Sequence, residues 1–535
     1  MAERTALVVI RTLTSLVRLQ DVVPLIDADR RVMLRYTLDE GSHFTAGLHA
    51  HLAACDIPLI SWAEASNTKF DLVLAAHTNA SLAELDGPLV VMPHGAGYNR
   101  VLPSRTASDT VPVGLSRQEL TSQGEVFPTV IGLSHERQID QLRRSCPPAV
   151  NRAVVIGDPT WDRLVASRTR RDSYRRHLGV TADQRLVVIS STWDVNSLLG
   201  QPERLVERLV AQLPMDEFRV ALVLHPNVWA HHGVNTILGW FRDCLDSGLM
   251  LIQPHDSWQA TLIAADAVVG DHGSVSFYGA ALGHPFLKAG NGLRDLAEES
   301  TTAAFMRGAD PIEPLGDLRA QIESCFVTHD PSYLRAITTQ ALGRKGESWS
   351  VLRRVLYDLM ALEPPASAPR MLPLNAPEPL RGNDVTACHV TASLRDGRLQ
   401  LERFPAVLEQ FRRATDVEEY FLVADDEETD HRLRASAEIV IRSTPLPKDH
   451  ALEWARTTLA ECSGATMVAA ATDDHCLVVL RSGEVLRSQD VLGSAAALYS
   501  WLATGGVLGD ELSLELRRHG STTQLTLRRL GAAAG

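Results

Sequence analysis

The sequence predicts an α/β protein with two tandem parallel-sheet domains, followed by a smaller α+β domain. Three observations support this fold class. Short apolar, β-rich runs alternate with helical patterns over about the first 360 residues. A proline-rich stretch then interrupts the alternation, and 535 residues are enough for about three domains of ordinary size.

The first domain is expected over residues 1–153, with strands in the runs TALVVI, RRVMLRY, FDLVLAA, PLVVMPH and TVIGLS. The second domain is expected over residues 154–362 and ends in closing helices. Its strands are expected in RAVVIG, RLVVISS, RVALVLHP, LMLIQP, ADAVVGD and HPFLKAG. Continuous apolar runs of this kind are typical of parallel strands that are buried on both faces.

A proline-rich linker is expected over residues 363–384, because proline breaks helices and cannot pair in a central strand. Residues 385–535 then form a separate α+β accessory domain, with strands in runs such as YFLVA and CLVVL. No motif in this domain indicates a chemistry. Acceptor recognition, binding of a protein partner and assembly into a homo-oligomer therefore all stay open for it.

Composition excludes several classes of partner. A net charge of −13 disfavours nucleic-acid binding. Seven scattered cysteines without a CxxC pair disfavour a disulfide framework and a structural zinc site, and they indicate a cytoplasmic protein. No apolar stretch approaches the roughly 18–20 residues that span a bilayer, so integral membrane association is not expected.

Ligands of parallel sheets bind beyond the carboxyl ends of the strands, so the residues at strand ends are the first candidates for a site. The run 265–285 ends a strand at Gly270-Asp271, turns through His272-Gly273 and enters a helix at Ser274. The amides of that helix N-terminus, with the hydroxyls of Ser274 and Ser276, would bind a phosphate. The alternative is an ordinary N-cap, in which Ser274 satisfies its own helix.

Three further strand ends carry polar side chains. His225 follows the strand of residues 220–224 and would donate to a phosphate oxygen, unless it is simply a packed loop residue. His94 precedes a glycine-containing loop and would act as a general base. Ser191 and Thr192 follow another strand and would bind phosphate or ribose, with an ordinary turn as the alternative.

In their order along the chain, these motifs resemble those of the CDP-glycerol glycerophosphotransferase-like family. The matches are His94-Gly95, a strand ending in Ser134, Gly157-Asp158-Pro159-Thr160-Trp161-Asp162, Ser191-Thr192-Trp193, His225-Pro226 and the turn into Ser274. His272-Gly273 stands where that family usually has Tyr-Ser, and Arg100 stands in for a lysine that often follows the HG loop.

The resemblance implies two Rossmann-like domains in a GT-B arrangement, extended here by the C-terminal α+β domain. It also implies metal-independent transfer of a glycosyl or glycerophosphoryl-type group to a hydroxyl acceptor. The donor would be a CDP- or UDP-linked nucleotide diphosphate in the inter-domain cleft, and no other cofactor is expected. The acidic composition favours a soluble acceptor, either a small molecule or a carrier-bound group.

In this hypothesis His94 and His225 are catalytic. The donor nucleotide and its phosphates are contacted by Gly95, Ser191, Thr192, Asp271, Gly273, Ser274 and Ser276, with Asp271 chiefly orienting its loop. Arg100 and Ser134 are candidates on the acceptor side. Two alternatives stay open, namely a nucleotide-sugar 2-epimerase or hydrolase, and a catalytically inactive nucleotide-binding scaffold protein.

Overall fold

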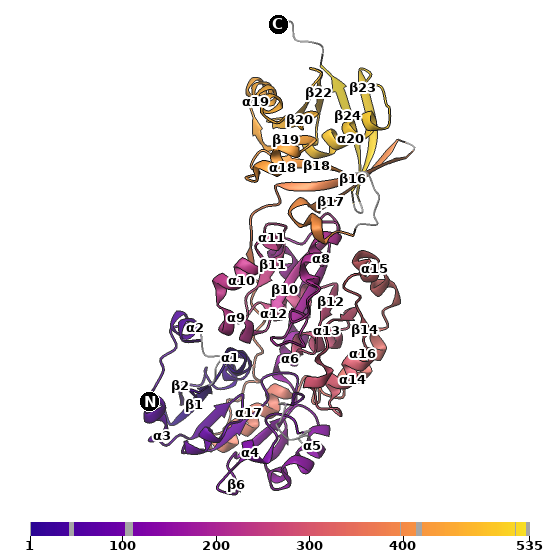
Figure 1. Cartoon of the computed structure of the whole chain (residues 1–535). Helices are drawn as coiled ribbons and strands as arrows, with labels where there is room; N and C mark the ends of the chain where they lie inside the picture. The colour runs from indigo at the N-terminus through magenta and orange to yellow at the C-terminus, as the bar shows by residue number, and fades with distance from the viewer. Residues whose placement is uncertain are drawn as a thin grey trace.

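The computed structural model describes residues 2–41, 48–101, 111–395, 397–413, 420–518 and 521–530. Within these residues the chain forms three domains that follow one another along the molecule, from indigo to yellow in Figure 1. The first two domains each contain a sheet of mainly parallel strands, and the third contains a closed sheet.

The first sheet consists of parallel strands that are buried on both faces. Along β1, Ala6 and Val8 face one hydrophobic core while Leu7 and Val9 face the other, as the alternation of a strand requires. In spatial order the strands are β2 (Val32–Leu38), β1 (Arg4–Ile10), β3 (Leu72–Ala75), β4 (Leu89–Val91), β7 (Val130–Leu133) and β8 (Ala153–Val155). The accompanying elements are α1 (Leu13–Gln20), α2 (Leu48–Ala54), α3 (Trp62–Ser66), α4 (Arg117–Leu120), α5 (Arg137–Ser145) and the hairpin of β5 (Thr121–Ser122) and β6 (Glu125–Val126).

The second sheet repeats this architecture with an additional edge strand. Its order is β14 (Asp310–Pro311), β13 (Phe286–Lys288), β12 (Ala267–Gly270), β9 (Arg185–Ser191), β10 (Phe218–Leu224), β11 (Met250–Ile252) and β15 (Pro379–Arg381). The helices of this domain are α6 (Pro159–Ser167), α7 (Arg171–Leu178), α8 (Leu205–Gln212), α9 (Pro226–His232), α10 (Val234–Trp240), α11 (Arg242–Leu245), α12 (Trp258–Ala264), α13 (Ser274–Leu282), α14 (Thr301–Gly308), α15 (Leu318–Thr328) and α16 (Pro331–Thr338). Short 3₁₀ turns complete the chain at η1 (Val23–Leu25), η2 (Ala80–Glu84), η3 (Pro147–Arg152), η4 (Arg168–Arg170), η5 (Gly292–Asp295) and η6 (Ala406–Phe411).

Helix α17 (Ser348–Leu359) corrects the predicted domain division. The sequence predicts that the helices up to residue 362 close the second domain. In the structure, Trp349, Leu352 and Leu356 of α17 are buried in the core of the first domain, beside α1 and β1. Figure 1 shows this helix lying among the indigo elements. The chain therefore returns to the first domain before it continues, and β8 likewise extends the first sheet two residues beyond 153.

The proline-rich segment is also more ordered than a linker needs to be. Leu374 is buried in the core of the second domain, and β15 pairs antiparallel with β11 at the edge of that sheet. An edge position explains how Pro379 is tolerated there, because an edge strand can lack one main-chain donor without breaking a central ladder.

The third domain is a closed sheet of nine strands around an apolar helix. Its order is β16 (Ala387–Arg395), β17 (Arg398–Pro405), β23 (Glu511–Arg518), β24 (Ser521–Arg529), β22 (Val485–Ser488), β21 (Cys476–Leu480), β20 (Met467–Thr472), β19 (Ile439–Leu446) and β18 (Tyr420–Asp425). Helix α20 (Val491–Ala503) shares one core with these strands, whereas α18 (His431–Ser436) and α19 (Lys448–Glu461) belong to the rest of the domain. A helix that is apolar on all sides needs such an enclosure.

The predicted fold class is confirmed. Two Rossmann-like domains face one another in a GT-B arrangement, and a C-terminal domain of strands and helices is added to them. No helix in the described part of the chain is long and apolar enough to cross a membrane.

Candidate active site

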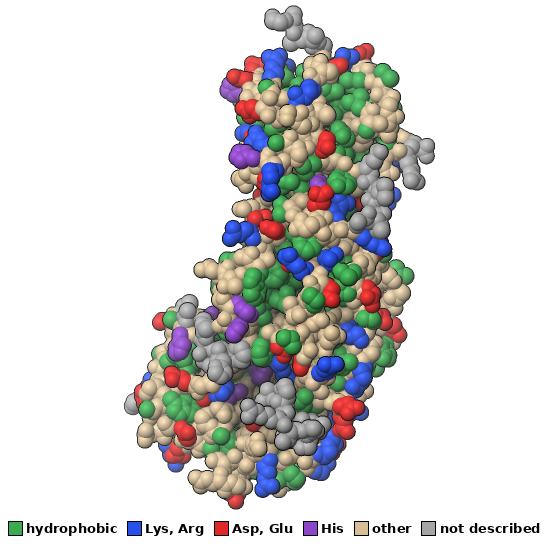
Figure 2. All heavy atoms as spheres, in the orientation of Figure 1, with side chains coloured by type: hydrophobic (Ala, Val, Ile, Leu, Met, Phe, Trp, Pro, Cys, Tyr) green, Lys and Arg blue, Asp and Glu red, His purple; other side chains and the backbone are tan. Residues whose placement is uncertain are grey.

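A cleft of about 420 Å³ lies between the first two domains. Its walls are formed by residues that follow β1, β3 and β4 of the first sheet and β9, β10 and β12 of the second. Parallel strands present their carboxyl ends at one edge of a sheet, so the two sheets bring their strand-end residues together here. Figure 2 shows histidine side chains gathered at this junction.

His94 is exposed to the cleft from the loop that follows β4. Its ring donates a hydrogen bond to the main-chain carbonyl of Ala76. Desolvation between the domains, followed by the charge of Arg18, lowers the pKa of His94 to about 4, and water in the cleft screens part of this effect. At neutral pH the ring is therefore uncharged. With one nitrogen committed as a donor, the other carries a lone pair that can accept a proton.

His225 also lines the cleft, and it is held at the start of α9. Its Nδ1 accepts a hydrogen bond from the Asn227 amide at 3.1 Å. Burial, followed by the neighbouring His94 and Arg100, lowers the pKa of His225 to about 3. A neutral ring whose Nδ1 is an acceptor carries its proton on Nε2, so Nε2 is the atom that can donate to a ligand.

Helix α13 begins at the cleft without a side-chain cap. The Ser274 hydroxyl instead accepts a hydrogen bond across the domain junction, from the amide of Ala96 at 3.2 Å. The N-cap alternative is therefore wrong, since Ser274 does not cap its own helix. Open amides at a helix N-terminus, with its positive dipole end, form a ready site for an anion.

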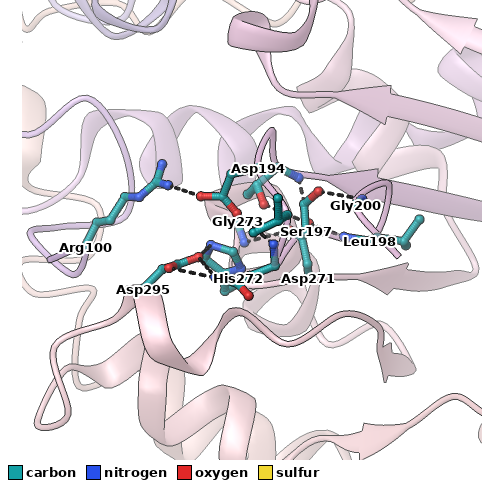
Figure 3. A network of polar contacts seen from close by, with 12 residues as sticks. Arg100, Asp194, Ser197, Leu198, Gly200, Asp271, His272, Gly273 and Asp295 are labelled. Atoms are coloured by element: carbon teal, nitrogen blue, oxygen red, sulfur yellow. Dashed lines mark hydrogen bonds and ion pairs between the residues drawn. The ribbon is translucent and has the colours of Figure 1, made fainter. Parts of the chain in front are cut away.

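Asp271 organises the loops beneath this helix (Figure 3). The carboxylate is fully buried and accepts hydrogen bonds from the amides of Thr192 at 2.7 Å, Leu198 at 3.0 Å and Gly273 at 3.2 Å. It also accepts from the Thr192 hydroxyl at 2.9 Å. Asp271 thereby fixes the chain after β9 to the chain after β12, with Gly273 positioned at the cleft wall.

Most of the site residues expected from sequence line the cleft, and three do not. The residues at the wall are His94, Gly95, Arg100, Ser191, Thr192, His225, Gly273 and Ser274. Asp271 lies behind the wall, and the Ser276 hydroxyl is buried against Gly270. Ser134 is buried as well, where its amide donates to Gln138 and its carbonyl accepts from Gly343. The expectation that Asp271, Ser276 and Ser134 contact a ligand directly is therefore wrong, because none of the three lines the cleft.

Arg100 ties the two domains together at the cleft. Its Nη2 donates to Asp194 of the second domain at 2.6 Å, as Figure 3 shows, and its guanidinium lies over the Trp193 ring at 4.9 Å. The main chain on either side adds two hydrogen bonds, from Val101 to the Asp295 carbonyl at 2.9 Å and from Ala297 to the Asn99 carbonyl at 2.8 Å.

The sequence analysis missed a cluster of charged and titratable side chains in the first domain, formed by Asp39, His77 and Arg11. Asp39, directly after β2, accepts from His77 Nε2 at 3.0 Å and from Arg11 at 2.8 Å. Burial alone would raise the pKa of Asp39, but His77 and Arg11 lower it to about 2. Arg11 and His77 line the cleft. The signal was present, because each of these residues lies at or within two positions of a strand end in the first sheet.

Arg18 was also missed, and no local signal marks it, because it lies inside a helix. Its buried guanidinium contacts the carbonyl of Gly95 and the side chains of Asp158 and Tyr278. Among the described residues, no cluster of three or more histidine, cysteine or acidic side chains is arranged to hold a metal ion.

No protein-family model matches the sequence, and no curated protein is significantly similar to it. Among solved structures, the chain is similar to the wall teichoic acid polymerase TagF, with 14% identity and a TM-score of 0.44 over 66% of this chain and 89% of that one. It is also similar to the MnaA–UDP complex of S. aureus, with 13% identity and a TM-score of 0.43 over 68% of this chain and 100% of that one. The UDP-GlcNAc 2-epimerase of Neisseria meningitidis, bound to UDP-GlcNAc, gives 13% identity and a TM-score of 0.42 over 66% and 100%.

Proposed function

We propose that this chain is a transferase that moves a glycosyl or glycerophosphoryl-type group from a nucleotide diphosphate donor to a hydroxyl acceptor. One observation carries the proposal. The neutral His94, which can accept a proton, shares a cleft with His225 and with the open N-terminus of α13. His225 is also neutral, and its Nε2–H can donate a hydrogen bond. A base beside an anion site is the arrangement that such a transfer requires.

In the proposed reaction, the acceptor hydroxyl attacks the reacting carbon or phosphorus of the donor. His94 takes the hydroxyl proton on the ring nitrogen that is not bonded to Ala76. The bond between the transferred group and the nucleotide breaks, and its electron pair remains on the departing phosphate. His225 Nε2–H, the Ser274 hydroxyl and the amides of α13 stabilise that charge, without a change of oxidation state.

The remaining wall residues have supporting roles in this proposal. Thr192 and Ser191 line the donor side of the cleft, and Gly95 and Gly273 complete its wall. A Cβ at Gly95 would collide with the Ser274 hydroxyl, so a side chain there would disturb the contact between the two domains. Arg100 is proposed to act on the acceptor side.

Donor binding is tested by thermal shift against CDP-, UDP-, GDP- and TDP-linked compounds. A ligand at 100 times its Kd stabilises the folded protein by about 2.7 kcal/mol, so modest affinity would register. We expect one base class to raise the melting temperature of the native protein. The same compound should raise the melting temperature of His225→Ala much less, because that variant lacks the imidazole N–H that would donate a hydrogen bond to the phosphate. No shift with any compound would contradict the proposal.

Catalysis is tested with His94→Ala. We expect the donor to bind with near-native affinity while turnover falls by about 10²–10⁴-fold, the usual contribution of a positioned base. Turnover near the native value would reject the role of His94. Products are analysed with and without an acceptor, because an epimerised or hydrolysed donor formed without an acceptor would indicate the 2-epimerase or hydrolase alternative.

A further inference from the structure

Arg18 lies at a buried junction of several segments of the chain. Its side chain is only 2% exposed. Nη2 donates to the Gly95 carbonyl at 2.6 Å, and Nη1 donates to Asp158 at 2.7 Å. Nη2 also donates to the Tyr278 hydroxyl at 3.1 Å, and that hydroxyl donates to Asp158 at 2.7 Å. The network therefore joins α1, the loop that carries His94, the N-cap residue of α6 and helix α13.

The members of this network come from both domains. Arg18 and Gly95 belong to the first domain, whereas Asp158 and Tyr278 belong to elements of the second. Burying such groups is costly, and apolar residues of similar volume would often pack as well or better. A network of this kind is therefore better explained by a need for one particular arrangement, and this one is complete only while the two domains are closed on each other.

The network also connects the two halves of the proposed reaction site. Tyr278 lies one helical turn beyond Ser274 on α13, and Gly95 directly follows His94. A second contact between the same segments is the hydrogen bond from Ala96 to the Ser274 hydroxyl. The base and the anion-binding helix are thus linked through one guanidinium and one main-chain contact.

We infer that Arg18 is the positioning residue of this site: it holds the loop that carries His94 against helix α13. This inference rests on the proposed function, in which His94 is the base. Arg18 contacts the loop and helix, and it acts on the reaction through His94.

The charges around His94 support this assignment. Arg18, His77 and Arg100 all disfavour a charged imidazole at His94, and the Ala76 carbonyl favours one. His94 in turn lowers the pKa of the neighbouring His225. After desolvation, Arg18 is the strongest of these influences on the pKa of His94. Its removal should therefore raise the pKa of His94 towards that of an ordinary histidine.

The charge effect is tested by the reactivity of His94 towards diethyl pyrocarbonate, which modifies neutral imidazole. The modification rate is followed by mass spectrometry between pH 4 and 8. Because Arg18→Met alone would leave a buried carboxylate uncompensated, it is combined with Asp158→Asn, which can still cap α6. We expect the midpoint of His94 reactivity to rise above its native value.

A matched control separates this effect from loosened domain packing. Arg163 of α6 pairs with Asp21 at the end of α1 at 2.8 Å, so it joins the same two helices without lining the cleft. Arg163→Met combined with Asp21→Asn should leave the His94 midpoint at its native value. A native midpoint in the folded Arg18→Met/Asp158→Asn variant, or an equal rise in the control, would overturn the charge effect.

The positioning effect is tested with Arg18→Lys, which keeps the charge but cannot reach all three partners of Arg18 at once. We expect the His94 midpoint to stay near native, kcat to fall at least about 10-fold and the donor KM to change little. An unchanged kcat would overturn the positioning effect. A native protein that transfers no group would overturn the proposed function instead, while the reactivity of His94 would still decide the effect of Arg18 on it.

Discussion

At the scale of single residues, the arginines that line the cleft are paired with carboxylates that lie behind its wall. Each of three cleft arginines pairs with a carboxylate that does not itself line the cleft. The pairs are Arg11 with Asp39 at 2.8 Å, Arg18 with Asp158 at 2.7 Å and Arg100 with Asp194 at 2.6 Å. The guanidinium groups are thereby held in fixed orientations at the cleft.

Asp271 has a structural role that can be tested separately from any activity. Asp271→Ala would leave the buried amides of Thr192 and Leu198 and the Thr192 hydroxyl without an acceptor. Leaving such donors unsatisfied should lower the free energy of unfolding of the second domain by on the order of 3 kcal/mol. Urea denaturation and hydrogen exchange of residues 190–199 measure the effect. Unchanged exchange in that segment would show that other groups hold the loop.

The side chains that were misplaced from sequence show what a motif leaves out. Ser274 and Ser276 both follow the same strand, but residues two apart on a helix do not face the same way. Ser274 therefore reaches the cleft while Ser276 turns into the core. A motif locates the turn, and the backbone decides which of its side chains meets a ligand.

At the scale of elements, the strands were predictable and the docking of α17 was not. Buried parallel strands have a local signature in their continuous apolar runs, so the runs expected in the first two domains all appear as strands. The apolar face of α17 indicates only that the helix is buried. Which domain buries it depends on the path of residues 339–347 between α16 and α17, and no periodicity encodes that path.

The docking of α17 predicts that a substitution near residue 350 destabilises the first domain. Leu352 is fully buried against that domain, and Leu352→Ala should cost about 2–5 kcal/mol of its unfolding free energy. Arg354→Ala, at an exposed position on the same helix, is the matched control and should change stability by less than about 0.5 kcal/mol. Hydrogen exchange resolves the domains. A loss of protection confined to the second domain would contradict the observed packing.

At the scale of the whole molecule, the C-terminal domain is docked on the second domain, at the end of the molecule opposite the first domain (Figure 1). The residues that line the cleft lie between Arg11 and Thr302, in the first two domains. Arg403 pairs with Asp216 through two hydrogen bonds of 2.9 and 2.5 Å. Leu408 and Phe411 of η6 enter the core of the second domain beside α8. The described residues that form the walls of the cleft therefore belong to the first two domains alone.

The pH dependence of stability is also a property of the whole molecule, because burial keeps two histidines of the second domain, His225 and His284, neutral. Desolvation, followed by the charge of Arg171, lowers the pKa of His284 to about 4, and burial lowers that of His225 to about 3. The unfolded chain binds these protons near pH 6.5, whereas the folded chain does not. Stability from these groups is therefore complete above about pH 6.5 and decreases as the pH falls towards 4.

His284→Gln isolates one of these contributions, because glutamine keeps an amide donor for the Leu262 carbonyl but does not titrate. Between pH 6.5 and 4, the native second domain should lose up to about 1.4 kcal/mol per pH unit for each such histidine. The variant should show a shallower fall in melting temperature over that range, with the native and variant curves parallel above pH 7. Curves that stay parallel down to pH 4 would mean that His284 is protonated as easily in the folded chain as in the unfolded one.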